Sequence, residues 1–250
     1  MHTRENNEEH SQGVTLMTGG SVRRQIVRFA LPVFWGNLFQ QLYNIVDSLV
    51  VGNFLGSDAL AAVGSSGHII FLLVGLFSGL FTGASVVISG YFGAQEHQKM
   101  HTAIHTTVAF GLLAGVVLSV VGVAVSPTLL RWIGTPESVF ANSALYFRIY
   151  FSGVVFVTLY NTATGILQAV GDSKHPLYYL IISSVTNVVL DLLFVAVFHM
   201  GVDGAALATV ISQAVSAVLG FIRLIRSNAI YRVEPKKVRL KGPMLAKVLH

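Results

Sequence analysis

The hydrophobic residues of this chain are grouped in six long blocks separated by short polar stretches. Each block is long enough to cross the roughly 30 Å hydrocarbon core of a bilayer as an α-helix. The short alternating segments typical of an outer-membrane barrel do not occur. The pattern therefore predicts an all-α membrane protein with six transmembrane helices. The expected spans are 26–51, 60–92, 105–127, 141–168, 176–198 and 204–224.

The composition supports the same class. The 250 residues are 53% hydrophobic and only 11% charged, whereas a soluble domain has about 25% charged residues to cover its surface. This excludes an ordinary soluble enzyme and a disordered protein. The chain has no cysteine, so disulfides, thiolate nucleophiles and cysteine-ligated metals are excluded as well.

The basic residues predict the orientation in the membrane. Four lie in the N-terminal flank, one in the second connection, one in the fourth and eight in the tail 223–250, whereas the other connections contain only Arg131. Because positive flanks stay in the cytoplasm, we expect both termini on the cytoplasmic side of a bacterial plasma membrane. We expect a polar tail (1–24), a six-helix unit (25–224) and a basic linker (225–250). A basic flank of this kind faces anionic lipid, so we expect the bilayer, and no nucleic acid, as its partner.

Three histidines recur every four residues at the start of the third span. His97, His101 and His105 would share one helix face, a spacing that metal sites use. The nearest carboxylate, Glu96, would point elsewhere. The pattern therefore favours a polar helix end over a metal site.

Three glycines are also spaced four residues apart in the second span. Gly75, Gly79 and Gly83 form a small-residue ladder on one face. Such a ladder predicts the close approach of a neighbouring helix.

Two acids lie inside spans, where ionisable residues are costly and usually functional. Asp47 is in the outer half of the first span and Asp191 in the outer half of the fifth. A poorly solvated carboxylate can gain and lose a proton near neutral pH, and carboxylate, amide and hydroxyl oxygens together also suit Na⁺. The alternative is a purely structural role, such as an ion pair with Arg148, the one base within a span.

Polar residues on facing spans predict an outward-opening cavity around these acids. Asn187 precedes Asp191 by one helical turn, and Thr209 lies at a similar depth on the sixth span. The remaining candidates are Gln40, Tyr43 and Asn44 on the face of Asp47, and Asn161 on the fourth span.

Four segments in order resemble the multidrug and toxic compound extrusion family of the MOP superfamily. They are FALPVFWGNLFQQLYNIVDSLVVGNFLGSDALAAVG (29–64), GASVVISGYFGAQ (83–95), GILQAVGDSKHPLYYLIISSVTNVVLDLLFV (165–195) and GVDGAALATVISQ (201–213). The family implies twelve helices in two lobes and the exchange of drugs, often organic cations, for H⁺ or Na⁺. By this resemblance the chain is the N-terminal lobe, and its ending looks like the linker to a second lobe.

The resemblance also implies roles for residues. The coupling-cation positions are Asp47, Asn187, Asp191 and Thr209, with Na⁺ held by the last three. The cavity positions are Gln40, Tyr43 and Asn161, beside Asn44. Pro32 matches a proline where helix bending has been proposed, and proline does remove a helical hydrogen bond.

We therefore expect a secondary antiporter that exports organic cations. No phosphate-binding loop is present, so we expect an ion gradient as the energy source, no cofactor besides the coupling ion, and no enzymatic activity. A second copy or a C-terminal lobe would complete the cleft. The alternatives are a lipid-linked oligosaccharide flippase of the same superfamily, which would need more intramembrane basic residues than Arg148, and a truncated membrane module that does not transport.

Overall fold

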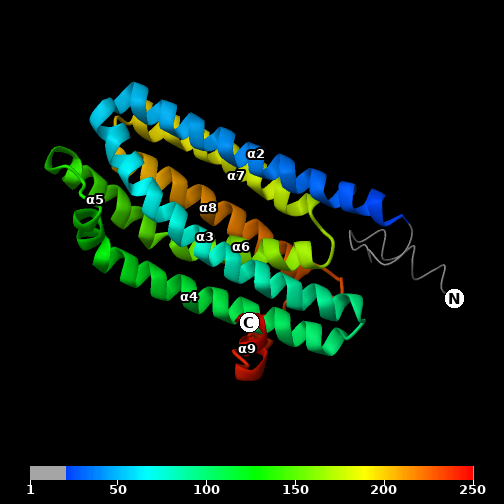
Figure 1. The fold of residues 1–250 in the computed structure, drawn as a ribbon. Helices are drawn as coiled ribbons and strands as arrows, with labels where there is room; N and C mark the ends of the chain where they lie inside the picture. Colours follow the sequence, from blue (N-terminus) through cyan, green and yellow to red (C-terminus); the bar gives the residue numbers. More distant parts are fainter. Residues whose placement is uncertain (1–20, 250) are drawn as a thin grey trace.

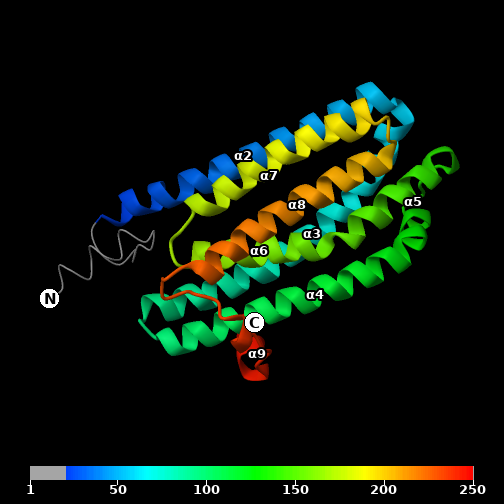
Figure 2. The ribbon, with the colours of Figure 1, turned by 180° about the vertical axis from the view of Figure 1, so that it is seen from behind.

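A computed structural model describes residues 21–249 as a bundle of long helices. The main helices are α2 (Val22–Leu55), α3 (Ser57–Gly93), α4 (His97–Trp132), α5 (Glu137–Ser152), α6 (Val154–Ala169), α7 (Lys174–Asp191) and α8 (Val202–Arg226). Three short elements complete the chain: the π-helix η1 (Leu192–Val197), the 3₁₀-helix η2 (Pro235–Lys237) and α9 (Gly242–Leu249). The long helices run along a common direction, and α9 packs against α3 and α4 at the side of the bundle (Figures 1 and 2).

The expected spans coincide with these helices, and the all-helical prediction is confirmed. The fourth expected span is the pair α5–α6, and the fifth is α7 with η1. By length and hydropathy alone, however, only α4, α7–η1 and α8 of the described residues qualify as spans, or four when the bent α5–α6 pair is included. Helix α2 is long enough, at 34 residues, but one of its faces is polar.

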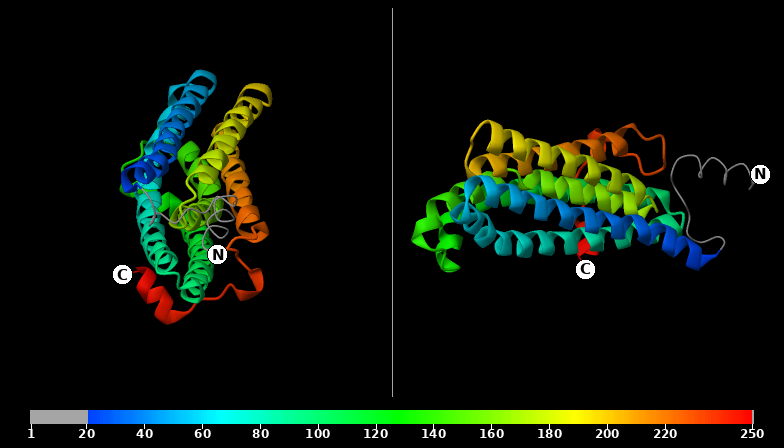
Figure 3. Two further views of the ribbon diagram at one scale, coloured as in Figure 1. Left: turned by 90° about the vertical axis from the view of Figure 1, so that its right-hand side faces the viewer. Right: turned by 90° about the horizontal axis from the view of Figure 1, so that it is seen from above.

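The two ends of the six-helix unit lie together. Helix α2 begins and α8 ends at the same end of the bundle, as the end-on and top views also show (Figures 1 and 3). An even number of crossings produces this arrangement. The expected polar tail falls almost entirely outside the described residues.

The expected span 141–168 is broken at Gly153. Helices α5 and α6 meet there at 45°. A side chain at Gly153 would collide with Val210 of α8, so the close approach of α8 requires a glycine. The Val155 N–H donates to Ser119 Oγ on α4 at 3.2 Å, and this contact satisfies a backbone donor at the start of α6.

The glycine ladder on α3 forms only part of the expected helix contact. A Cβ added at Gly75 or Gly79 meets open space, and one at Gly83 meets only the Val248 carbonyl oxygen of α9, at 3.2 Å. The ladder prediction is confirmed only at Gly83, where α9 approaches closely, and is wrong at Gly75 and Gly79, because small residues permit close approach without requiring it.

The close helix contacts lie on α4 instead. A Cβ at Gly111 or Gly115 would collide with the hydroxyls of Thr162 or Thr158 on α6, and one at Gly122 with the Phe151 ring of α5. These glycines allow α4 to pack directly on α5 and α6.

The outward face of α4 is apolar. Leu113, Val117 and Val120 are between 50% and 66% exposed. A soluble protein seldom exposes such a continuous surface, whereas a helix facing lipid requires it.

The basic segment after α8 is not a free linker. Ala229, Tyr231 and Val233 are buried in a hydrophobic cluster with residues of α4 and α6, such as Ile104 and Ile166. The chain therefore folds back over the end of the bundle before α9 begins.

The histidine series differs from the expected polar helix end. His105 is buried, at 5% exposed, and its ring stacks on that of His101. Among the side chains that the structure describes, no group of metal-ligating residues comes together. Glu96 instead pairs with Lys99 at 2.9 Å.

Candidate cation and substrate cavity

A cavity of about 780 Å³, lined by both polar and apolar residues, opens between α2, α3 and the helices from α5 to α8. It brings together most of the residues singled out in the sequence. Those that line it are Pro32, Gln40, Tyr43, Asn44, Asp47, Asn161 and Thr209. They come from α2, α6 and α8, three elements that are far apart along the chain.

Asp47 is the acid at the cavity wall. It is 9% exposed, and its Oδ1 atom has no hydrogen-bond partner among the described residues. Its helix α2 packs along α7, which brings it toward the second acid.

Asp191 and Asn187 lie behind this wall on α7. They are 0% and 1% exposed and do not line the cavity. Both carboxylate oxygens of Asp191 and both amide atoms of Asn187 are without a hydrogen-bond partner in the described part of the chain. An unpaired buried polar group costs about 1–3 kcal/mol, so this cluster of orphaned atoms fits a site that a ligand completes.

The two carboxylates interact across the α2–α7 interface. The negative charge of Asp47 acts on the Asp191 carboxyl, and Asp191 in turn contacts the Asp47 carboxyl. Two negative charges at short range in a poorly solvated site repel strongly. A proton or a small cation held by the pair relieves this repulsion.

Thr209 and Asn161 contribute oxygen atoms from α8 and α6. Thr209 Oγ1 donates to the Ala205 carbonyl at 3.1 Å, and its oxygen can still accept a bond or contact a cation. Asn161 Nδ2 donates to the Val157 carbonyl at 2.9 Å.

Comparison with known proteins identifies the architecture that carries this cavity. The family model MatE, of multidrug and toxic compound extrusion transporters, matches residues 32–193. The chain belongs to the MatE family. Its members are multi-pass membrane transporters, so the membrane class inferred from hydropathy is confirmed.

Two similar MatE relatives come from Bacillus subtilis. The chain is 33% identical to the probable multidrug resistance protein YpnP over 213 residues, which cover 85% of the chain and 48% of YpnP. It is 39% identical to the probable multidrug resistance protein YoeA over 196 residues, which cover 77% of the chain and 42% of YoeA.

Solved structures of MatE-type transporters have the same fold. A MOP superfamily transporter from Pyrococcus furiosus superposes with a TM-score of 0.86 at 26% identity, covering 95% of this chain and 52% of that one. A MATE structure in a bent conformation gives a TM-score of 0.88 at 26% identity, covering 95% and 53%. The chain spans about half the length of the MatE relatives that it matches.

Three further tyrosines of the cavity, besides the predicted Tyr43, were not expected from the sequence. Tyr146 and Tyr150 on α5 and Tyr160 on α6 line the cavity, with Gln213 of α8 beside Tyr43. The rings of Tyr146 and Tyr150 stack with centroids 6.4 Å apart. Their spacing of four residues was a usable signal, because it places both on one helix face.

The proposed structural pair with Arg148 is wrong. Arg148 is exposed, and the ion pairs found in the described residues are Glu96–Lys99, Asp172–His175 and Glu234–Lys237. On α5 it lies two residues from Tyr146 and from Tyr150, roughly opposite the cavity face. Among the described residues, neither Asp47 at the cavity wall nor Asp191 behind it has a basic partner.

Proposed function

We propose that this chain forms the cation-binding half of a secondary antiporter that exports organic cations in exchange for H⁺ or Na⁺. One observation carries the proposal: Asp47 at the cavity wall lies beside the buried Asp191, and neither acid forms an ion pair with a basic residue in the described part of the chain. The names of its relatives support multidrug efflux, including a 23% identical multidrug export protein, MepA, from Staphylococcus aureus.

The proposed coupling follows from charge. While the Asp47–Asp191 pair is negative, it attracts an organic cation, and the tyrosine faces that line the cavity add cation–π attraction. When the pair takes up H⁺ or Na⁺, the negative charge falls and the hold on the organic cation weakens. Release of the coupling ion to the cytoplasm then resets the site.

The residues suit both coupling ions. A proton needs only the carboxylates, whereas Na⁺ prefers several oxygen ligands. We assign that role to Asn187, Asp191 and Thr209 together, with Asp47 as the partner charge.

The proposed antiporter also needs a second half. Relatives of twice this length are consistent with a cleft between two lobes that opens alternately to each side. We propose that a C-terminal lobe or a second copy completes the cleft. We also propose a bacterial plasma-membrane location with both termini in the cytoplasm, since α2 begins and α8 ends at one end of the bundle.

The lining favours cations over a pyrophosphate-linked lipid. Neither lysine nor arginine is among the described residues that line the cavity. A lipid-linked oligosaccharide flippase would need such residues to bind its phosphates.

Ethidium efflux from drug-sensitive cells tests the proposal. The chain would be expressed as it stands and fused to the second half of YoeA, as wild type, Asp47→Asn and Asp191→Asn. The control is Asp58→Asn, an exposed acid in the first turn of α3. We expect efflux in the fused form to fall to background in both cavity variants and to persist in the control. Wild-type efflux in either cavity variant, or no efflux from any fused version at normal membrane abundance, would overturn the proposal.

A further inference from the structure

The segment after α8, residues 227–238, is held against the end of the bundle; we name it the strap. Tyr231 and Val233 are 0% and 2% exposed. The Val233 N–H donates to the Leu224 carbonyl of α8 at 2.9 Å. The next residue, Glu234, makes the one direct hydrogen bond that the described residues show between the strap and α4.

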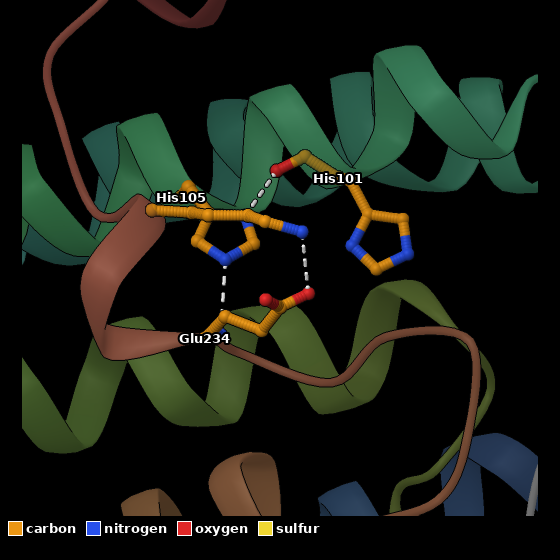
Figure 4. A network of polar contacts seen from close by, with 4 residues as sticks. His101, His105 and Glu234 are labelled. Atoms are coloured by element: carbon orange, nitrogen blue, oxygen red, sulfur yellow. Dashed lines mark hydrogen bonds and ion pairs between the residues drawn. The ribbon is translucent and has the colours of Figure 1, made fainter.

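This bond ends on a buried histidine (Figure 4). The Glu234 backbone N–H donates to His105 Nε2 at 3.0 Å. On the other side of the ring, His105 Nδ1 lies 2.7 Å from the carbonyl oxygen of His101. A carbonyl only accepts and a backbone N–H only donates, so the proton sits on Nδ1 and the Nε2 lone pair is the acceptor. Together, the two hydrogen bonds require the neutral imidazole with its proton on Nδ1.

A second proton is incompatible with the docked strap. It would have to bind Nε2, where it would meet the Glu234 N–H, so that two donors would face each other in a buried site. We propose that His105 is a proton-sensitive latch that holds the strap on α4 while its imidazole is neutral and releases it on protonation.

The charges nearest to His105 lie on its own helix and on the strap. His97 and His101 precede it by two turns and by one turn, and the His101 ring centroid is 6.0 Å away. Arg232 and Lys237 act on Glu234 from within the strap, and the Lys237 Nζ donates to the Glu234 Oε1 at 2.8 Å. This contact lowers the pKa of the Glu234 carboxyl, so the carboxylate stays charged throughout the range in which a histidine titrates.

The other elements that pack near this end add few titratable groups. Helix α6 has no charged residue, and the last two turns of α3 carry only Tyr91. Helix α8 contributes Arg223 and Arg226, and α9 contributes Lys247. None of these is a carboxylate. The carboxylate that acts on His105 is that of Glu234 in the strap itself, and its ion pair with Lys237 offsets part of its attraction for a protonated ring.

The expected size of the effect follows from linkage. A solvated imidazole takes up a proton at about pH 6.5. When His105 binds this proton with the strap open and not with the strap docked, the population of the open state increases as pH falls. The opening constant then rises about 4-fold by pH 6 and about 30-fold by pH 5, relative to its value above pH 8.

Hydrogen exchange of the 250-residue chain in lipid nanodiscs tests the latch. Exchange of a peptide containing Val233 and Glu234 is compared between pH 8 and pH 5, after correction for the intrinsic pH dependence of exchange. His105→Gln retains an acceptor that does not titrate, and His101→Gln is the matched control one turn away. Amides of α6 report whether each variant keeps its fold.

We expect protection at Val233 and Glu234 to fall about 30-fold in the wild type and in His101→Gln, and to stay constant in His105→Gln. Constant protection in the wild type, or an equal loss in His105→Gln, would overturn the latch. Should His105→Gln fail to fold, ¹⁵N NMR of the wild-type imidazole decides instead. The Nδ1–H tautomer at pH 8 that gives way to the doubly protonated ring on acidification supports the latch, and the Nε2–H tautomer contradicts it.

Discussion

In the proposed mechanism, Asp47 and the tyrosines that line the same cavity act differently on one organic cation. The acid supplies a charge that a coupling ion can cancel, whereas Tyr146 and Tyr150 supply aromatic faces whose attraction does not depend on that ion. Affinity for an organic cation should therefore have a switchable part and a constant part.

Tyr150→Ala tests the constant part. A cation–π contact is worth about 0.5–2 kcal/mol, so we expect ethidium affinity to fall roughly 2- to 30-fold. Tyr150→Phe keeps the ring face and should keep most of the affinity. Tyr178→Ala, an exposed tyrosine of α7 outside the cavity lining, is the control. Fluorescence anisotropy of ethidium measures all four proteins, and equal affinity in Tyr150→Ala and the wild type would refute the contact.

The residue scale also shows which positions the sequence could predict. Asp47 and Asp191 were predictable because a charge inside an apolar span is rare and costly. Tyr43 was predictable from its place on the face of Asp47. The four-residue spacing of Tyr146 and Tyr150 placed them on one helix face, but only the packing of α5 shows that this face lines the cavity. The burial of Asp191 beside Asp47 likewise depends on three-dimensional contacts.

At the scale of elements, hydropathy located the helices but not their irregularities. The break at Gly153 depends on Val210 of α8, a residue 57 positions away in the sequence. The π-helix η1 directly follows the buried Asp191, and its apolar composition matches that of any span. Glycine spacing also misled, because Gly75 and Gly79 of the ladder on α3 face open space, whereas the glycines of α4 contact α5 and α6 closely.

Gly115→Ala tests that contact. Alanine is favoured over glycine in a helix by about 1 kcal/mol, but here its Cβ would collide with Thr158 and lie 2.9 Å from the Val155 Cα. Overpacking costs about 1–3 kcal/mol, and the backbone of Val155 cannot swing aside, so we expect the collision to outweigh the helix preference. The thermal midpoint should fall by a few degrees.

Gly79→Ala is the matched variant on α3. Its added methyl group meets open space, so the helix preference acts alone and the midpoint should stay level or rise. Thermal unfolding in detergent, followed by size-exclusion chromatography, compares the two proteins. The same midpoint shift in both would show that the α4 glycines do not set the helix approach.

At the scale of the whole molecule, the chain spans about half the length of the MatE relatives that it matches, and the segment after α8 folds back on the bundle. Its membrane class followed from composition and its family from four segments in order. The docking of the strap did not follow, because its basic residues predicted a cytoplasmic linker beside anionic lipid. The apolar residues Ala229, Ile230, Tyr231 and Val233 within this basic segment were the overlooked signal, since they pack in one hydrophobic cluster. Because this chain forms a cavity of its own, cation binding can be tested independently of transport.

The central claim is that a coupling cation and an organic cation compete through the Asp47–Asp191 pair. The most direct test is ethidium affinity of the purified chain, measured by anisotropy at pH 8 and pH 5.5, each with and without Na⁺. We expect acidification or Na⁺ to weaken binding in the wild type and in Asp58→Asn, and neither to change it in Asp47→Asn or Asp191→Asn. Ethidium binding that neither cation alters in the wild type, or that both alter equally in every variant, would contradict the account.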